Sequence, residues 1–186
     1  MKKTMTHEAA RRLCVTAMLM AMNVVLSSFG VPVPGGHLYL NDIVICTAAL
    51  LLDPAAAFCV GGVGAFLGDL LFYPTPMFVS LVTHGLQAVV ISLCARHLLR
   101  KKQTQPAETD TAGTAGTAET WAAIIGVTLG AVIMVVGYTL GRAYLYSTPE
   151  YALLKLPYQI LQAAVGALAG VILYRPLRKY RQTARK

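Results

Sequence analysis

The sequence predicts an all-α membrane protein with six transmembrane helices and both termini in the cytoplasm. Of its 186 residues, 56% are hydrophobic and only 13% are charged, and the mean hydropathy is +0.59. An ordinary soluble domain is about 45–50% apolar and about 25% charged. The apolar residues form six runs, and the basic residues cluster beside these runs. A chain of this length is expected to form a single domain, residues 1–186.

The six apolar runs are the expected spans, because about 17–25 apolar residues cross a bilayer as a helix. Asp53-Pro54 ends the second run, and a Tyr-Pro-Thr-Pro sequence after residue 72 ends the third. These two runs are short, so their boundaries are soft. The expected spans are 13–29, 38–52, 55–72, 77–98, 121–146 and 151–174.

The segment at about 103–120 separates the fourth run from the fifth. It contains a Thr-Ala-Gly-Thr-Ala-Gly repeat and has no apolar period. Such low-complexity composition is typical of linkers. We therefore expect a flexible cytoplasmic linker between a four-helix part and a two-helix part of the single domain.

Basic residues determine the expected orientation, because cytoplasmic ends of membrane helices are enriched in Lys and Arg. Placing both termini and the linker in the cytoplasm brings 14 of the 16 basic residues to that side. Only Arg142 and Lys155 remain outside. The three cytoplasmic clusters are Lys2, Lys3, Arg11 and Arg12; Arg96, Arg100, Lys101 and Lys102; and Arg175, Arg178, Lys179, Arg181, Arg185 and Lys186.

The formal charge of +8 does not indicate a nucleic-acid partner. Nucleic-acid binding needs a basic face with stacking or base-reading groups between the charges, whereas these clusters flank apolar runs. The basic start and apolar core of the first run are also typical of a secretory signal. However, residues 31–36 contain no Ala-x-Ala cleavage pattern. We expect a retained helix in contact with membrane lipid.

Strongly polar side chains gather at one depth of the predicted bundle. In hydrocarbon a polar group costs a few kcal/mol unless it is paired or hydrated, so such residues are functional candidates. They occupy the outer parts of five of the six helices, whereas the cytoplasmic halves hold little beyond Ser and Thr. This pattern predicts a pocket open to the outside rather than a pore. The candidate substrate-binding residues are Asn41, Asp42, Asp69, His84, Gln87, Tyr138, Arg142, Tyr158, Gln159 and Gln162.

Spacing places several of these candidates on shared helix faces, as for His84 and Gln87 three residues apart. Gln162 is the strongest candidate, because an amide in an apolar helix needs a partner. Simpler roles stay open: His84 could be a packing histidine, and Asp69 with Arg142 a structural ion pair. The aromatic belt at the membrane interface is the expected place of Tyr39, Tyr73 and Tyr146.

Small residues predict two kinds of close helix contact. Four glycines in 55–72 and two in 151–174 suit packing inside the bundle. Ala17 and Ala21 lie four residues apart on the first helix, near the cytoplasmic side. We expect this alanine pair to contact a partner outside the chain.

Signals for catalysis are weak. The sequence has no G-x-S-x-G, H-E-x-x-H or Walker A motif. We expect no enzyme activity, no ATPase of its own and no cofactor. His37, Asp42, Asp69 and His84 could bind a metal, but they are spread along separate segments, so we expect no metal site.

Two alternatives come from other functional classes. One is an intramembrane enzyme that acts on a lipid or isoprenoid with Asp69 and His84 as acid and base. The other is a self-sufficient, ion-coupled carrier. A carrier predicts polar residues down to mid-membrane and an internal repeat, and the sequence shows neither.

Five segments carry a resemblance to a known family. They are GGHLYLND at 35–42, AALLLDP at 48–54, GGVGAFLGDLL at 61–71, HG at 84–85 and LPYQILQAAVG at 156–166. In this order and spacing they resemble the substrate-binding S component of energy-coupling factor (ECF) transporters, and most closely its riboflavin-type branch. The resemblance covers nearly all of the chain except the linker.

The resemblance implies capture of a water-soluble vitamin or vitamin precursor, of the riboflavin, thiamine-precursor or vitamin B6 type. It also implies a bacterial cell membrane, a membrane T component and two cytoplasmic ATPase subunits as partners, and toppling of the protein to release its cargo. Segment 31–39 would act as a lid. Ala17 and Ala21 match the family's Ala-x-x-x-Ala docking motif.

The pocket would stack an aromatic heterocycle on Tyr138 or Tyr158. Amide side chains would hydrogen-bond the ring edge, and three other groups would determine the charge preference. The amides are Gln87, Gln159 and Gln162, and the other groups are His84, Asp69 and Arg142.

Three positions depart from the family pattern. His84 stands where relatives often carry Lys, Asn41-Asp42 where they often have Gly-Asp, and Tyr158 where Asn often follows the proline. The N-terminus also lacks the early Met-His of nickel and cobalt members, which argues against a metal cargo. These departures leave the identity of the vitamin open.

Overall fold

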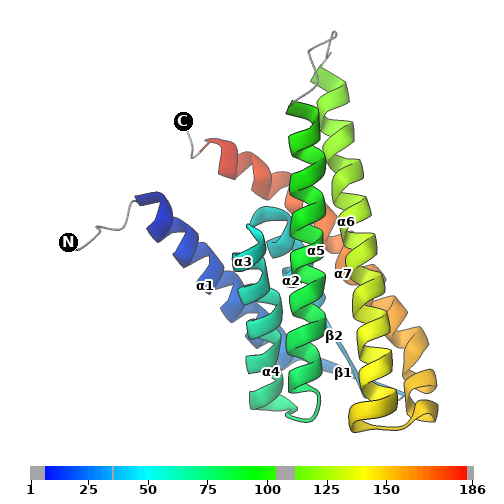
Figure 1. Cartoon of the computed structure of the whole chain (residues 1–186). Helices are drawn as coiled ribbons and strands as arrows, with labels where there is room; N and C mark the ends of the chain where they lie inside the picture. Colours follow the sequence, from blue (N-terminus) through cyan, green and yellow to red (C-terminus); the bar gives the residue numbers. More distant parts are fainter. Residues whose placement is uncertain (1–6, 35, 104–111, 184–186) are drawn as a thin grey trace.

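The structure, a computed structural model, describes residues 7–34, 36–103 and 112–183. They form a bundle of long helices with a short β-hairpin at one end (Figure 1). Helices suit these apolar runs, because a helix satisfies its backbone polar groups internally when no water is present. The elements are α1 (His7–Ser27), β1 (Gly30–Val33), β2 (Gly36–Tyr39), α2 (Asn41–Leu51), α3 (Pro54–Phe58), the π-helical segment η1 (Cys59–Val63), α4 (Gly64–Phe72), α5 (Met77–Gln103), α6 (Ala112–Gly141), the π-helical segment η2 (Arg142–Tyr146) and α7 (Pro149–Thr183).

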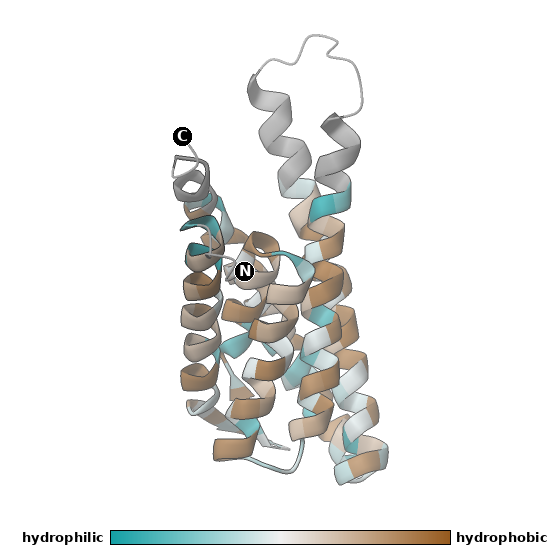
Figure 2. Cartoon of the chain, turned by 60° about the vertical axis from the view of Figure 1, so that its left-hand side comes forward, coloured by the Kyte–Doolittle hydropathy of each residue, from teal (hydrophilic) through white to brown (hydrophobic). Residues whose placement is uncertain are grey.

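Five helical segments in the described part of the chain are long and apolar enough to cross a membrane. Figure 2 shows hydrophobic residues along the outer faces of these helices. The prediction of a helical membrane protein is confirmed at this level. The sixth apolar run forms the shorter helix α2, of 11 residues. The five long segments are His7–Ser27, Pro54–Phe72, Met77–His97, Thr120–Tyr146 and Pro149–Leu177.

The segment expected to begin the second span folds as a hairpin instead. β1 and β2 pair antiparallel, from Gly30 opposite Tyr39 to Val33 opposite Gly36. The prediction of helix at residues 38–40 is therefore wrong, and an all-α description omits this element. The Val-Pro-Val-Pro sequence cannot continue a helix, and Gly36 has a φ of 136°, which favours glycine. The hairpin falls on the segment expected to act as a lid.

The segment expected to be a linker is partly helical. α5 continues to Gln103, and α6 already begins at Ala112. Residues 112–120 therefore extend a membrane helix instead of separating two parts of the chain. The remaining linker residues, 104–111, lie outside the described part of the chain.

α1 is attached to the bundle through polar side chains in its second half. Asn23 and Ser27 are its buried residues. Asn23 Nδ2 donates a hydrogen bond to the carbonyl oxygen of Val60 at 2.6 Å. Val60 belongs to η1, and a π-helical segment disturbs the regular backbone pairing of an α-helix. Much of the remaining α1 surface is exposed, as Met18 is at 66%.

α2 is the centre of the bundle, with nine of its 11 residues buried. It contacts α1, α5 and α7. A Cβ atom at Gly166 of α7 would lie 2.5 Å from Asp42 Cβ, and one at Gly170 would lie 2.6 Å from Cys46 Cβ. These two glycines, four residues apart, let α7 pack directly against α2.

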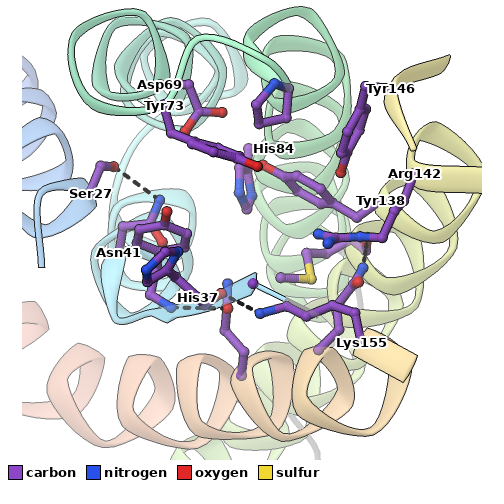
Figure 3. A pocket seen from close by; sticks show the side chains of 16 residues that line it. Ser27, His37, Asn41, Asp69, Tyr73, His84, Tyr138, Arg142, Tyr146 and Lys155 are labelled. Atoms are coloured by element: carbon purple, nitrogen blue, oxygen red, sulfur yellow. Dashed lines mark hydrogen bonds between the residues drawn. The ribbon is translucent and has the colours of Figure 1, made fainter. Parts of the chain in front are cut away.

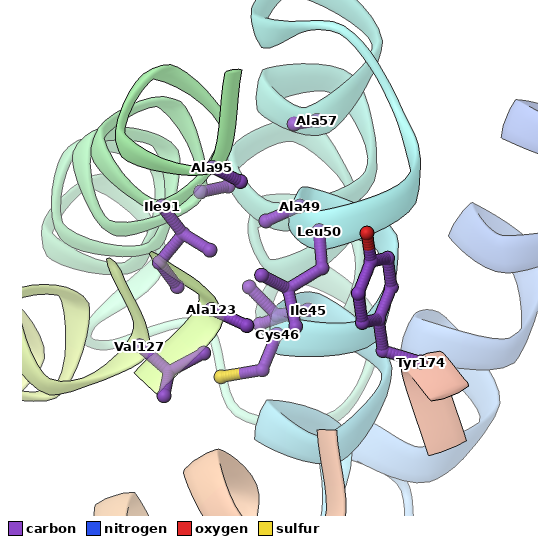
Figure 4. Packing of buried hydrophobic residues seen from close by; sticks show 11 residues of the cluster. Ile45, Cys46, Ala49, Leu50, Ala57, Ile91, Ala95, Ala123, Val127 and Tyr174 are labelled. Carbon is purple, nitrogen blue, oxygen red and sulfur yellow. The ribbon is translucent and has the colours of Figure 1, made fainter. Parts of the chain in front are cut away.

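An apolar cluster surrounds the later turns of α2 (Figure 4). Ile45, Ala88 and Ile91 are fully inaccessible to solvent. The cluster draws residues from α2, α3, α5, α6 and α7, so it holds most of the bundle together. Its members are Ile45, Cys46, Ala49, Leu50, Ala57, Ala88, Ile91, Ala95, Ala123, Val127 and Tyr174.

The two ends of the bundle differ in character (Figure 1). The start of α1, the end of α7 and the facing ends of α5 and α6 lie at one end, which we call the basic end. The hairpin and the connection from α4 to α5 lie at the other, the hairpin end. At the basic end Arg12 forms an ion pair with Asp53. Burial raises the pKa of Asp53, but the hydrogen bond and charge of Arg12 outweigh it and hold the pKa below its ordinary value.

Gly166→Leu should destabilise the bundle, because any side chain at this position must displace α2 at Asp42. We expect a loss of about 1–3 kcal/mol in the free energy of unfolding, the usual cost of overpacking. Denaturant titration in mixed micelles measures it. Ala164→Leu is the matched control, because Ala164 lies exposed on the same helix. Equal stability of the two variants would contradict the observed contact between α2 and α7.

Candidate binding pocket

A pocket lies at the hairpin end, between the hairpin and the ends of the surrounding helices (Figure 3). Its cavity volume is about 60 Å³, and part of the space is open to solvent. The lining residues are Ser27, Gly36, His37, Tyr39, Asn41, Asp69, Tyr73, Pro76, His84, Met134, Tyr138, Arg142, Tyr146, Lys155, Gln159 and Gln162.

A buried carboxylate lies directly behind this lining. Asp42, only 1% exposed, accepts hydrogen bonds from Gln87 Nε2 at 3.2 Å and from Gln162 Nε2 at 2.7 Å. Gln162 Oε1 in turn accepts the backbone N–H of Tyr39 at 3.1 Å. These four residues, which we call the Asp42 network, join α2, α5, α7 and the hairpin. Each carboxylate oxygen has a donor, as burial of a charged group requires.

The same network determines which proton His84 carries. Its Nδ1 lies 2.7 Å from Gln87 Oε1. Since an amide oxygen can only accept, Nδ1 carries a proton. The same nitrogen lies 3.7 Å from Asp42 Oδ1. The ring also packs against Tyr138, with the two centroids 5.2 Å apart. His84 is therefore held in a fixed orientation beside an aromatic face of the pocket.

Asp69 and Tyr138 are linked through Ser80. The Ser80 hydroxyl donates to Asp69 Oδ2. Because a serine hydroxyl has one proton, Tyr138 must be the donor in its 2.5 Å contact with the Ser80 oxygen. These two hydrogen bonds hold the Asp69 carboxyl group and the Tyr138 hydroxyl on the α4 and α6 side of the pocket.

Arg142 and Lys155 line another part of the pocket, and we call them the cationic pair. Lys155 is 3% exposed, and its Nζ donates to the backbone carbonyl of His37 in β2. A Cβ atom at Gly36 would lie 3.6 Å from Arg142 Nη1 and 4.0 Å from Lys155 Nζ. Both cationic groups therefore lie beside the same residue of the hairpin. In Figure 3 they are across the pocket from Asp69.

Aromatic residues and a buried amide complete the lining. Tyr39 lines the pocket from the last position of β2. Asn41 is 5% exposed, and its Oδ1 has no hydrogen-bond partner among the described residues. A bound molecule or a water can supply the missing donor.

Seven of the ten predicted substrate-binding residues line the pocket. Asp42 and Gln87 lie just behind the lining, in the network that supports it. Tyr158 does not line the pocket, so the structure offers no stacking position there. The seven lining residues are Asn41, Asp69, His84, Tyr138, Arg142, Gln159 and Gln162. The predicted docking residues Ala17 and Ala21 lie exposed on α1.

Several lining residues were missed by the sequence-based interpretation. Three tyrosines, at 39, 73 and 146, were expected in the interfacial belt, which lies at the same depth as the pocket. The distribution of basic residues placed Lys155 on the outer side of the membrane, but nothing in that argument assigned it to the pocket. Its spacing was nevertheless informative, because Lys155, Gln159 and Gln162 follow one another on a single helix face. Gly36 and His37 belong to the segment expected to act as a lid, whereas Ser27, Pro76 and Met134 gave no signal.

Comparisons with known proteins agree with this architecture. The family described as ECF-type riboflavin transporter, S component, matches residues 8–179. A Pyrococcus woesei protein, described as an uncharacterised protein in the gap 3′ region, is 28% identical over 152 residues, which cover 81% of this chain and 89% of that protein. A solved structure described as the S component of a bacterial ECF transporter superposes with a TM-score of 0.61 and 20% identity. It covers 92% of this chain and 97% of its own, and at that identity it shows the fold alone.

Gln162→Leu should release the hairpin from the bundle, because it removes the acceptor of the Tyr39 amide and a donor to Asp42. We expect hydrogen exchange of the Tyr39 amide to accelerate about tenfold, equivalent to about 1.4 kcal/mol. Amide exchange read by mass spectrometry or NMR measures it. Gln159→Leu is the matched control, because Gln159 donates to carbonyl oxygens of α6 instead. Unchanged exchange at Tyr39 in Gln162→Leu would contradict the anchoring role.

Proposed function

Since the chain belongs to the ECF-type riboflavin transporter S component family, we propose that it is the high-affinity substrate-binding subunit of an ECF-type ABC importer. Its cargo is a water-soluble vitamin or vitamin precursor, of the riboflavin, thiamine-precursor or vitamin B6 type. S components are transport subunits rather than enzymes. The pocket at the hairpin end is the observation that carries the proposal for this chain.

The lining suits a flat, polar heterocycle. Tyr39, Tyr73, Tyr138 and Tyr146 supply aromatic faces, which stack well on such rings. The ring edge would find donors and acceptors in the side chains of the pocket, including Asn41 and Gln159. A concave site with a few oriented polar groups is typical of small-molecule recognition.

The distribution of charge supports an orientation with the pocket outside. The described basic residues of the three clusters lie toward the basic end, where positive charge is typical of the cytoplasmic side. Both termini would then be cytoplasmic, and α2 with the hairpin above it would complete the sixth crossing. The proposed location is the bacterial cell membrane.

The proposed partners are a membrane T component and two cytoplasmic ATPase subunits. The sequence carries no Walker A motif, so energy for uptake would come from such partners. α1 supports a docking role, because Ala17 and Ala21 are exposed and leave a shallow surface for another helix.

The enzyme alternative gains no support from the pocket. His84 is hydrogen-bonded to Gln87, and Asp69 to Ser80. Both groups therefore have partners that hold them in the fold, and these contacts add no observation that favours acid–base chemistry over binding.

Purified chain in lipid nanodiscs should bind one vitamin of the proposed panel at one molecule per chain. The panel is riboflavin, thiamine with its pyrimidine precursor, and pyridoxine, and titration calorimetry or native mass spectrometry measures binding. We expect a Kd below about 1 μM, equivalent to about −8 kcal/mol. Failure of the whole panel, and of phosphorylated forms, to bind would overturn the proposed function.

Replacing Ala17 and Ala21 together with Trp should block docking without entering the pocket. We expect vitamin binding to stay within about twofold of the original and ATP-driven uptake to fall at least about tenfold. Uptake into vesicles containing the partners measures the second effect. Replacing exposed Met18 and Met22 with Trp controls for bulk elsewhere on α1. Loss of vitamin binding would instead place the alanine pair within the binding machinery.

A further inference from the structure

Lys155 is a buried cation that the fold alone does not explain. It is 3% exposed, yet no carboxylate of the described residues lies within 4.0 Å of its Nζ. Among the described residues, its Nζ donates to the neutral carbonyl of His37. An ammonium group has three N–H donors, so this contact leaves capacity for another acceptor.

A second cation lies in the same part of the pocket. The distances from Gly36 place Arg142 Nη1 and Lys155 Nζ beside one residue of the hairpin. Two like charges brought together in a partly desolvated space repel each other. Lys155 is the buried member of the pair. Since buried charges are normally paired, an anion at Lys155 Nζ would complete its environment, and Arg142 lies close enough to share that anion.

The acidic groups of the pocket do not fill this need. Asp42 lies behind the lining and accepts from Gln87 and Gln162. Asp69 accepts from Ser80, and Figure 3 shows it across the pocket from Lys155. The pocket is therefore polarised, with acceptors near α4 and cationic donors near η2 and α7.

We propose that Arg142 and Lys155 bind an oxyanionic group of the cargo, so that the transported vitamin or precursor is an anion bearing a phosphate ester or a carboxylate. A guanidinium supplies two parallel donors and an ammonium supplies a point charge, a combination suited to either group. The inference rests on the proposed function, because it specifies the cargo of the same pocket. It also adds Lys155 to the residues expected to determine the charge preference of the pocket. Lys155 also donates a hydrogen bond to the hairpin at His37.

The test compares anionic ligands with their neutral parents in nanodiscs of phosphatidylcholine. The pairs are riboflavin with riboflavin 5′-phosphate, and pyridoxine with pyridoxine 5′-phosphate and with 4-pyridoxate. We expect one anionic ligand to bind at least tenfold more tightly than its parent. The phosphate and carboxylate members of the pyridoxine set distinguish the two kinds of oxyanion.

Lys155→Met should reduce that tenfold preference to about one, and Lys155→Arg should retain most of it. Arg96→Met is the matched control, because it removes one cation from an exposed site at the basic end. If Lys155→Met does not fold, the unchanged protein supplies the readout. Raising KCl from about 0.05 M to about 0.5 M should then weaken the anionic ligand more than its parent.

Two results would overturn the inference, and they differ in what else they affect. If a neutral parent binds as tightly as its anionic forms, with no greater salt sensitivity of the anions, the cargo is not selected by charge and the proposed function stands. If neither neutral nor anionic ligands bind, the proposed function fails together with this inference.

Discussion

The arrangement of this molecule depends on supplying hydrogen-bond donors to one carboxyl group buried inside a helical bundle. Asp42 begins the most buried helix, and its two oxygens take their donors from α5 and α7. An unpaired charge there would be very costly, so the three helices must hold a defined register. Gly166 makes this register possible by letting α7 approach α2 at Asp42 itself. The hairpin is attached to these helices because the Tyr39 backbone N–H donates to Gln162 Oε1.

This arrangement connects the fold to binding. The Asp42 network supports the pocket from behind and lies between the lining and the apolar cluster that starts at Ile45. The π-helical segment η2 brings Arg142 and Tyr146 into the lining within a single turn, and such segments are common at functional sites. Polar groups near the hairpin thus line the pocket, while apolar side chains toward the basic end pack the bundle together. The pocket and the apolar packing that holds the helices together therefore lie at different depths of the bundle.

Hydropathy predicted the helical membrane class, because a bilayer leaves a helix as the simplest way to satisfy the backbone. It also located most of the pocket, since a polar residue such as Gln162 has few places to lie in hydrocarbon. Depth alone could not distinguish pocket tyrosines from belt tyrosines, because their direction around the bundle depends on tertiary packing. The hairpin was missed because Leu38 and Tyr39 continue an apolar run although their backbone is paired with β1. Tyr158 was assigned to the pocket by spacing, but its neighbour Gln159 occupies the lining instead.

The short length of α2 has an electrical consequence. Its 11 residues span about 16 Å, roughly half of the 30 Å hydrocarbon thickness of a bilayer. The hairpin and a pocket partly open to solvent lie above it. A transmembrane voltage falls mainly across the part of a membrane protein that excludes water and ions. In the proposed orientation that part is thinner beneath the pocket than in the surrounding lipid, so the voltage acts there over a shorter distance.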